Sequence, residues 1–210
     1  MPLFKTITAN HNTEIFIWKI TESYDQLVEE VQLNELNTVR LNGMRSQQHR
    51  LGFLSVRKLL QQNGYTDFDL NYDEFGKPHL KDGKHISITH SHEFSAIAIS
   101  DINIGIDIEK KREKISVVAD KFADYEFKYL DNKDHDDYIS KLTVIWGIKE
   151  AIFKVRNEPG ISFKDHIKVQ PFAMESTKAD ALLEFGNAIH KFPAFFNTIE
   201  NFILVYTFEN

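Results

Sequence analysis

The chain has 210 residues, of which 42% are hydrophobic and 27% charged, a composition typical of a globular protein with one large or two small domains. The formal net charge of −6 argues against broad nucleic-acid binding, which depends on a basic surface. The sequence contains no cysteine, which excludes disulfides, thiolate metal sites and cysteine nucleophiles.

Apolar periodicity and turn residues predict one strand and two helices in the first half of the chain, followed by a run of strands. Gly64 is a suitable stop signal for the second helix. The predicted strands cover residues 14–19, 68–72, 85–90, 94–100 and 103–109, and the predicted helices cover 23–36 and 44–62.

The second half repeats this order loosely, with a helix over residues 137–156 and strands over 166–172, 181–185 and 201–209. Helices and strands do not alternate strictly, which favours an α+β fold over a doubly wound sheet. We predict two similar halves, 1–102 and 103–210, each with a long helix packed on a small antiparallel sheet. The halves share little residue identity, so a coincidence of element order is the alternative to an internal duplication.

An acidic strand follows the predicted boundary. Asp107 and Glu109 are two residues apart, so on a strand they project from one face, while Ile104, Ile106 and Ile108 project from the other. Two carboxylates on one face could hold Mg²⁺, which takes a few carboxylates together with water and substrate phosphate. A half-buried strand with a solvated acidic face is the alternative.

The long helix of the second half contains Trp146, Glu150 and Lys154 at a spacing of four residues, which places them close to one helical face. Glu150 could be a third metal ligand or a proton acceptor, and Lys154 could pair with a phosphate. An ordinary surface Glu–Lys pair is the alternative. Gly147 costs about 1 kcal/mol relative to Ala inside a helix, so it indicates a packing or access requirement.

Two polar segments lie in the first half. Thr89 and His90 could donate hydrogen bonds to a phosphate, with a polar strand edge as the main alternative and a zinc site with His92 as a weaker one. Gly76, Lys77 and Pro78 form a shaped turn that presents a lysine to an anionic ligand, or a plain turn. This turn lacks the spacing of a P-loop.

Together, Gly-Lys-Pro (76–78), Ile-Thr-His-Ser (88–91), Gly-Ile-Asp-Ile-Glu (105–109) and Trp-x-x-Lys-Glu-Ala-x-x-Lys (146–154) resemble the ordered motifs of the 4′-phosphopantetheinyl transferases. The length of the chain is similar to that of the surfactin-synthetase-activating type, in which one chain has two similar halves related by a pseudo-twofold axis. The motifs cover roughly residues 45–155. Departures are Ser87, where the family often has Asn, Thr89 in place of Ser, and Gly147 in place of Ser, Thr or Ala.

The resemblance implies roles for matching residues. It implies that Asp107, Glu109 and Glu150 bind Mg²⁺, that Glu150 is the general base directly or through a water, and that Lys154 positions the reacting groups. The coenzyme A contacts that it implies are Lys77 and Pro78 beside the nucleotide, Thr89 and His90 at the phosphates, and one of Arg50 and Arg57, with the choice between these two arginines open.

The function implied is Mg²⁺-dependent transfer of 4′-phosphopantetheine from coenzyme A to a serine of an apo acyl carrier protein, or of a peptidyl or polyketide carrier domain, with release of 3′,5′-ADP. This is the reaction of a holo-acyl-carrier-protein synthase, expected at the interface between the halves of a monomer. The resemblance also implies that the carrier docks at the helix beginning near Ile115 and at the loop after it. Another Mg²⁺-dependent phosphoester enzyme and a non-catalytic binding module are the alternatives.

We also expect a cytoplasmic protein without a membrane partner. No apolar run approaches the ~20 residues that a membrane span needs, and residues 1–18 lack the basic and apolar regions of a signal peptide.

Overall fold

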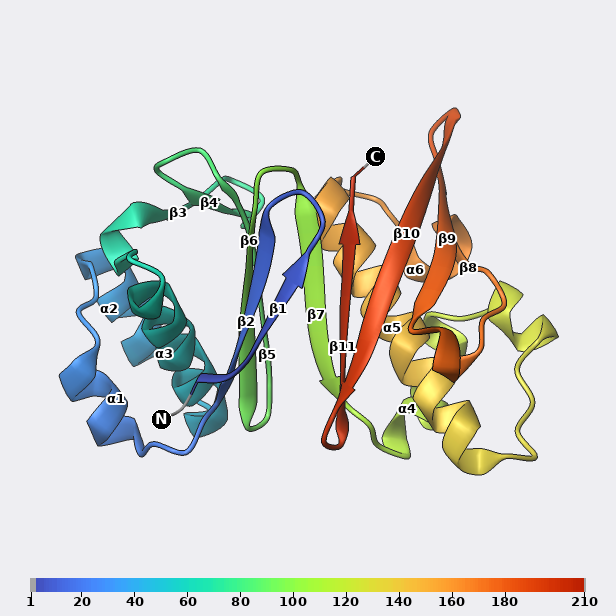
Figure 1. Cartoon of the computed structure of the whole chain (residues 1–210), viewed down its shortest axis with the longest axis horizontal. Helices are drawn as coiled ribbons and strands as arrows, with labels where there is room; N and C mark the ends of the chain where they lie inside the picture. Colours follow the sequence, from blue (N-terminus) through green and yellow to red (C-terminus); the bar gives the residue numbers. More distant parts are fainter. Residues whose placement is uncertain (1–2, 210) are drawn as a thin grey trace. The chain divides into compact units, whose positions relative to one another are not determined.

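The computed structural model describes residues 3–209, and the chain forms two compact units, Met1–Ile102 (unit 1) and Asn103–Asn210 (unit 2). Each unit has an antiparallel sheet with helices against it (Figure 1). The predicted α+β class with antiparallel sheets is therefore confirmed. The pseudo-twofold relation between the halves stays a prediction.

The described part of unit 1 has a six-stranded sheet in the order β1-β2-β6-β5-β4-β3, with antiparallel neighbours. Its strands are β1 (Leu3–Ala9), β2 (Thr13–Lys19), β3 (Leu70–Tyr72), β4 (Pro78–Leu80), β5 (His85–Ser91) and β6 (Phe94–Ser100). Its helices are α1 (Tyr24–Glu30), α2 (Glu35–Gly43), α3 (Gln47–Gln62) and the 3-10 helix η1 (Asp67–Asp69).

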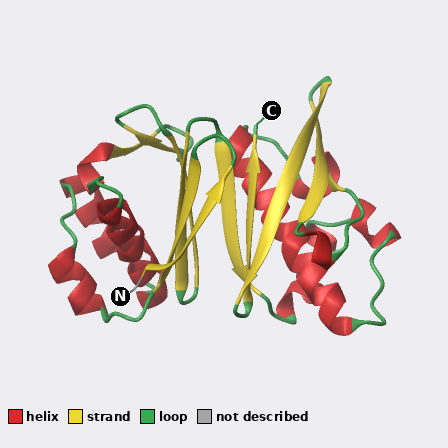
Figure 2. Cartoon of the chain, viewed as in Figure 1, coloured by secondary structure: helices red, strands yellow, loops and turns green. Residues whose placement is uncertain are grey.

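The core of unit 1 lies between α3 and the sheet, and Figure 2 shows the helices of this unit gathered on one side of its strands. Val56, Leu59 and Leu60 of α3 are buried against Trp18 of β2 and Ile97 of β6. Removing this apolar surface from water stabilises the unit by roughly 25 cal/mol per Å². The same packing fixes α3 over β5, which contains Thr89 and His90.

The predicted helix over residues 23–36 covers α1 and only the first two residues of α2, which continues to Gly43. Ser23 caps α1 and Asn34 caps α2, each through a side-chain oxygen that accepts the backbone N–H three residues later. The backbone at Val31 is extended, so the first helix ends there. The single-helix prediction is wrong because Asn stabilises a helix start better than a helix interior.

The described part of unit 2 has a five-stranded antiparallel sheet in the order β7-β11-β10-β9-β8. Its strands are β7 (Ile104–Lys110), β8 (Ile167–Val169), β9 (Lys178–Phe185), β10 (Ala188–Ile199) and β11 (Phe202–Phe208). Its helices are α4 (Lys114–Val118), α5 (His135–Arg156), α6 (Phe163–His166) and the 3-10 helices η2 (Ala119–Lys121), η3 (Tyr125–Lys128) and η4 (Met174–Ser176).

Helix α5 is the central helix of unit 2 and lies against β7 and β11. The Asp134 side chain caps its N-terminus, and Asn157 ends it in a left-handed conformation with φ 49°. Leu142, Ile145 and Ile148 are among its residues in the main core of this unit. The predicted helix over residues 137–156 is thus confirmed to within two residues.

Three strands, β1, β4 and β10, were not predicted from the sequence patterns. Strand β10 alternates, with Phe192, Ala194 and Phe196 buried. Pro193 obscures this pattern because proline cannot donate to a strand ladder and usually argues against a strand interior. Within residues 3–209, every helix is too short or too polar to cross a lipid bilayer.

Candidate active site

The acidic residues of β7 face helix α5. Lys154 of α5 donates hydrogen bonds to the Ile106 carbonyl at 2.8 Å and to Asp107 Oδ1 at 2.9 Å. Asp107 is only 5% exposed, and Glu109, two residues further along the strand, is half-buried. The alternative of a solvated acidic face is therefore wrong for Asp107, which lies beneath the helix.

Two glycines allow α5 to approach β7 this closely. A Cβ on Gly105 would overlap the carbonyl oxygen of Ala151 in α5. A Cβ on Gly147 of α5 would lie 2.7 Å from Val205 Cγ2 of β11 and 3.8 Å from Asp107 Oδ2. The packing requirement that Gly147 indicated in the sequence is confirmed, because any larger residue would push the helix away from the carboxylates.

Glu150 of α5 belongs to the same electrostatic cluster. Burial, as the largest cause, together with the negative charges of Asp107 and Glu109 raises the pKa of Glu150 to about 7, against the opposing effect of the Lys154 ammonium. A carboxyl group that responds to both acidic residues of β7 lies near them. The fold therefore gathers three carboxylates and one lysine from two segments about 40 residues apart.

The donor set is chemically suited to Mg²⁺, which prefers carboxylate oxygen and dehydrates reluctantly. Among residues 3–209, however, no three His, Cys, Asp or Glu side chains are close enough to form a ready-made metal cage. Mg²⁺ usually takes one or two carboxylates with water and substrate phosphates rather than an all-protein cage. Asp107, Glu109 and Glu150 fit that manner of binding, in which the phosphate completes the ligand set. The zinc alternative at His90 and His92 has no such support.

Lys149 has a structural role that the sequence pattern did not reveal. Its side chain is fully buried and forms an ion pair with the equally buried Glu126 at 2.8 Å. The same Nζ donates to the carbonyls of Phe122 at 2.8 Å and Phe163 at 3.0 Å. Both aromatic rings contact Trp146, with centroids at 5.1 and 5.5 Å. Trp146 therefore packs into the core, while Lys154 points to β7.

A cavity of about 230 Å³ opens beside Glu109 in unit 2. Its lining combines a carboxylate, three cationic side chains and four apolar ones, from β7, α5 and the segment that contains α4. Such a lining suits a ligand with anionic and apolar parts. The lining residues are Glu109, Lys110, Arg112, Lys114, Ile115, Val118, Phe122 and Trp146.

In unit 1, Asp73 shapes the loop that presents Lys77 between β3 and β4. Asp73 Oδ1 accepts the backbone N–H groups of Phe75 at 3.0 Å and Lys77 at 2.9 Å, and Gly76 adopts φ +83°. These hydrogen bonds lower the pKa of Asp73. Lys77 and Pro78 are half-buried, so a defined loop holds them at the start of β4.

Thr89 is buried on β5, and the neighbouring His90 is exposed and lies against α3. A Cβ on Gly52 would lie 2.8 Å from the His90 ring, so only glycine leaves room for that ring. His49, in the first turn of α3, has its ring centroid 6.0 Å from that of His90. Neither Gly52 nor His49 was predicted from the sequence, although a glycine inside a predicted helix is a signal of close packing at Gly52.

The structure separates the two arginines of α3. Arg57 is 2% exposed, and its Nε donates to Asp67 Oδ1 at 2.9 Å. Arg50 is half-buried, donates to the Met44 carbonyl at 2.7 Å and lies over the Tyr24 ring. Arg57 is therefore removed from the predicted coenzyme contacts, because its guanidinium is enclosed in unit 1 and already binds a carboxylate.

Comparison with known proteins gives a family match. The sequence profile of the 4′-phosphopantetheinyl transferase superfamily matches residues 103–193. Over 110 residues, the chain is 36% identical to 4′-phosphopantetheinyl transferase gsp of Aneurinibacillus migulanus, an alignment that covers 50% of this chain and 46% of that protein.

Two Bacillus proteins are also similar. The 4′-phosphopantetheinyl transferase Sfp of Bacillus subtilis (strain 168) is 31% identical over 110 residues, which are 50% of this chain and 49% of that protein. The 4′-phosphopantetheinyl transferase ffp of Bacillus subtilis is 27% identical over 141 residues, 63% of each chain. The matched part of this chain thus spans about half the length of the first two relatives.

Proposed function

We infer that this chain, whose residues 103–193 match the profile of the 4′-phosphopantetheinyl transferase superfamily, transfers 4′-phosphopantetheine from coenzyme A to a serine of an apo carrier protein. The family predicted from the four motifs is supported by that match and by the similarity to the three named transferases. The observation that best supports the activity is the cluster of Asp107, Glu150 and Lys154. In this cluster Glu150, whose pKa is raised to about 7, lies beside the ion pair of Asp107 and Lys154.

Asp107, Glu109 and Glu150 would hold Mg²⁺ in this proposal. When bound, the ion supplies charge neutralisation at the pyrophosphate of coenzyme A. Lys154 is 28% exposed at its side chain and already pairs with Asp107. Its ammonium orients that carboxylate through a hydrogen bond, and it also offers a donor to the reacting phosphate.

The proposed transfer is a substitution at phosphorus. The serine oxygen of the carrier forms a bond to the β-phosphorus of coenzyme A, and the bond from that phosphorus to the 3′,5′-ADP oxygen breaks. The serine proton goes to Glu150, directly or through a water. In the metal-free protein the pKa of Glu150 is about 7, a value that suits a general base near neutral pH.

Unit 1 supplies nucleotide recognition in this proposal. Lys77 and Pro78 border the nucleotide, and Thr89, His90 and Arg50 contact the phosphates. A hydroxyl, an imidazole and a guanidinium are suitable donors to phosphate oxygens. The shaped loop built on Asp73 and the space that Gly52 leaves for His90 support these assignments.

The cavity beside Glu109 is proposed to receive the pantetheine arm, which has apolar and hydrogen-bonding parts. The partner is an apo acyl carrier protein or a peptidyl or polyketide carrier domain. We propose a monomer, since one chain contains both sets of residues, and a pseudo-twofold relation between the halves.

One incubation tests this function against its alternatives. The chain is mixed with coenzyme A, Mg²⁺ and a panel of apo carrier proteins, and the carriers are weighed by mass spectrometry. We expect a mass gain of one phosphopantetheine that disappears with a chelator and with a carrier whose acceptor serine is replaced by Ala. Cleavage of coenzyme A without a mass gain would indicate a hydrolase, and binding without turnover would indicate a binding module.

A further inference from the structure

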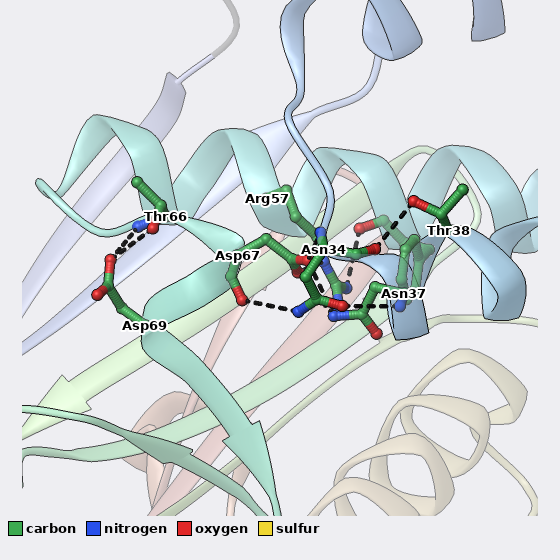
Figure 3. Close-up of polar contacts among 8 residues, drawn as sticks. Asn34, Asn37, Thr38, Arg57, Thr66, Asp67 and Asp69 are labelled. Atoms are coloured by element: carbon green, nitrogen blue, oxygen red, sulfur yellow. Dashed lines mark hydrogen bonds and ion pairs between the residues drawn. The ribbon is translucent and has the colours of Figure 1, made fainter.

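A buried carboxylate in unit 1, Asp67, holds three separate segments together (Figure 3). Asp67 is 2% exposed. Its Oδ1 accepts from Arg57 Nε and from Asn37 Nδ2, both at 2.9 Å, and its Oδ2 accepts from the Asn34 backbone N–H at 2.9 Å and from Asn37 Nδ2 at 3.0 Å. The Asp67 carbonyl also accepts from Asn34 Nδ2 at 3.3 Å. One residue of η1 thereby binds both α2 and α3.

These contacts fix the start of α2. Asn34 is the N-cap of α2, and its side-chain oxygen accepts the backbone N–H of Asn37. Asp67 binds the backbone and side-chain nitrogens of this cap and the side chain of Asn37. A negative charge at a helix N-terminus is also favourable to the helix dipole. The position of α2 thus depends directly on Asp67.

The same residue begins the hairpin that presents Lys77. Asp67 opens η1, which continues into β3, and β3 pairs with β4 across the loop of residues 73–77. A second link lies at the other end of β3, where Arg40 of α2 stacks over the Tyr72 ring at 5.3 Å. Helix α2 is therefore attached to this hairpin at both ends of β3.

Arg57 makes the arrangement sensitive to the charge of Asp67. The guanidinium is buried, lies 3.5 Å from the centroid of the Phe53 ring, and pairs with Asp67 as its one ion-pair partner among the described residues. Its Nη2 has no hydrogen-bond partner there. Loss of the carboxylate charge would leave a buried cation uncompensated, which is strongly unfavourable.

We propose that Asp67 is a positioning residue for coenzyme A, which fixes α2 and the β3–β4 hairpin to α3 so that the Lys77 loop is held in its binding conformation. This inference rests on the proposed function, in which Lys77 borders the nucleotide. It predicts an effect on coenzyme affinity that is separate from the chemistry at Asp107 and Glu150.

The test is Asp67→Asn, an isosteric change that removes the charge and one pair of acceptor sites. If the loop then spends about a tenth of its time in the binding conformation, the coenzyme A Kd and KM rise about tenfold. We expect kcat and the KM for the carrier protein to stay within about twofold. Titration calorimetry gives the Kd without carrier or turnover, and hydrogen exchange at the Lys77 amide reports the loop.

Asp69→Asn is the matched control. Asp69 is in the same 3-10 helix, and the hydrogen bonds of its side chain to other described residues stay within that turn, to the backbone and hydroxyl of Thr66 (Figure 3). The Asp69→Asn protein should bind coenzyme A with the same affinity as the wild type. If Asp67→Asn does not fold, Asn37→Ala retains the Asp67–Arg57 pair, removes the side-chain hydrogen bonds from Asn37 of α2 to Asp67 and should raise the Kd about threefold.

The outcomes separate the two claims. An Asp67→Asn or Asn37→Ala protein that folds and binds coenzyme A as tightly as the wild type overturns the positioning role alone. A loss of kcat equal to the rise in KM, or an equal effect of Asp69→Asn, overturns it as well. A wild-type chain that does not bind coenzyme A overturns the proposed function and, with it, this inference.

Discussion

Lys154 Nζ lies 2.9 Å from Asp107 Oδ1, which joins helix α5 to strand β7 at the centre of the acidic cluster. Asp107 is enclosed and Lys154 is 28% exposed at its side chain. The lysine therefore lies between the buried Asp107 carboxylate and solvent. This arrangement suits a residue that meets a phosphate on one side and a carboxylate on the other.

Asp107→Ala should nearly abolish transfer, by at least about 100-fold, because the cluster loses a metal ligand and the partner of Lys154. The fold should persist, since α5 keeps its apolar contacts. The measurement is mass gain on an apo carrier protein, with circular dichroism as a check of folding. Asp136→Ala is the control, because Asp136 is also an aspartate paired with a lysine but is 81% exposed. Full activity in Asp107→Ala would contradict the metal-site assignment.

Lys154→Ala should lower kcat more than it weakens coenzyme A binding, by about 10- to 100-fold, because the ammonium acts on developing charge. Steady-state kinetics with calorimetric Kd values separate the two effects. Lys141→Ala, on the same helix and paired with Asp137, should leave both unchanged. An unaltered kcat in Lys154→Ala would remove this lysine from the proposed mechanism.

The raised pKa of Glu150, about 7, makes stability depend on pH in the metal-free protein. In the unfolded chain the pKa of a glutamate is about 4.3. Between about pH 4.5 and 7, the folded state therefore binds more protons at Glu150 than the unfolded state. The free energy of unfolding should therefore fall as pH rises through this window, by on the order of 1–3 kcal/mol.

Denaturant unfolding at about pH 5 and pH 8 measures this effect, with Glu150→Gln as the comparison. Glutamine does not titrate, so the variant should lose less stability across the window than the wild type. The same pH dependence in both proteins would contradict the position of Glu150 beside Asp107. Added Mg²⁺ should reduce the difference, because the ion favours the ionised carboxylate.

Gly105→Ala should destabilise unit 2 by about 1–3 kcal/mol, since its Cβ would overlap the Ala151 carbonyl and the backbone there has little room to move. Gly43→Ala is the matched control, because no atom lies within 4 Å of its added Cβ. The control should change stability by less than about 0.5 kcal/mol. Thermal unfolding of both variants measures the difference in stability. Equal melting temperatures would show that α5 does not lie this close to β7.

Lys149→Met should cost about 3–5 kcal/mol, because Glu126 would remain buried without its cation. The double variant Lys149→Met with Glu126→Gln should recover part of the loss, since it leaves no buried charge. Lys141→Met, which breaks a surface pair, should cost less than about 1 kcal/mol. Chemical denaturation measures all three, and a small effect of Lys149→Met would argue that the ion pair is not enclosed.

The long helices α3 and α5, the alternating strands and most residues of the acidic cluster could be predicted from the sequence, because their periodicity is local. Strand β10 could not, since Pro193 disguises its alternation and only pairing with β9 and β11 stabilises it. Helices α1 and α2 could not be separated either, because the boundary depends on Asn34 binding Asp67.

The order of residues along the chain by itself determined that an acidic strand precedes a helix with a glutamate and a lysine on neighbouring turns. Alternation with period two placed Asp107 and Glu109 on one face, whatever surrounds the strand. Only the tertiary structure decided between Arg50 and Arg57. Seven residues are nearly two whole helical turns, so both arginines lie close to one face of α3. The contacts made on folding, with Asp67 above all, enclose Arg57, while Arg50 stays half-buried.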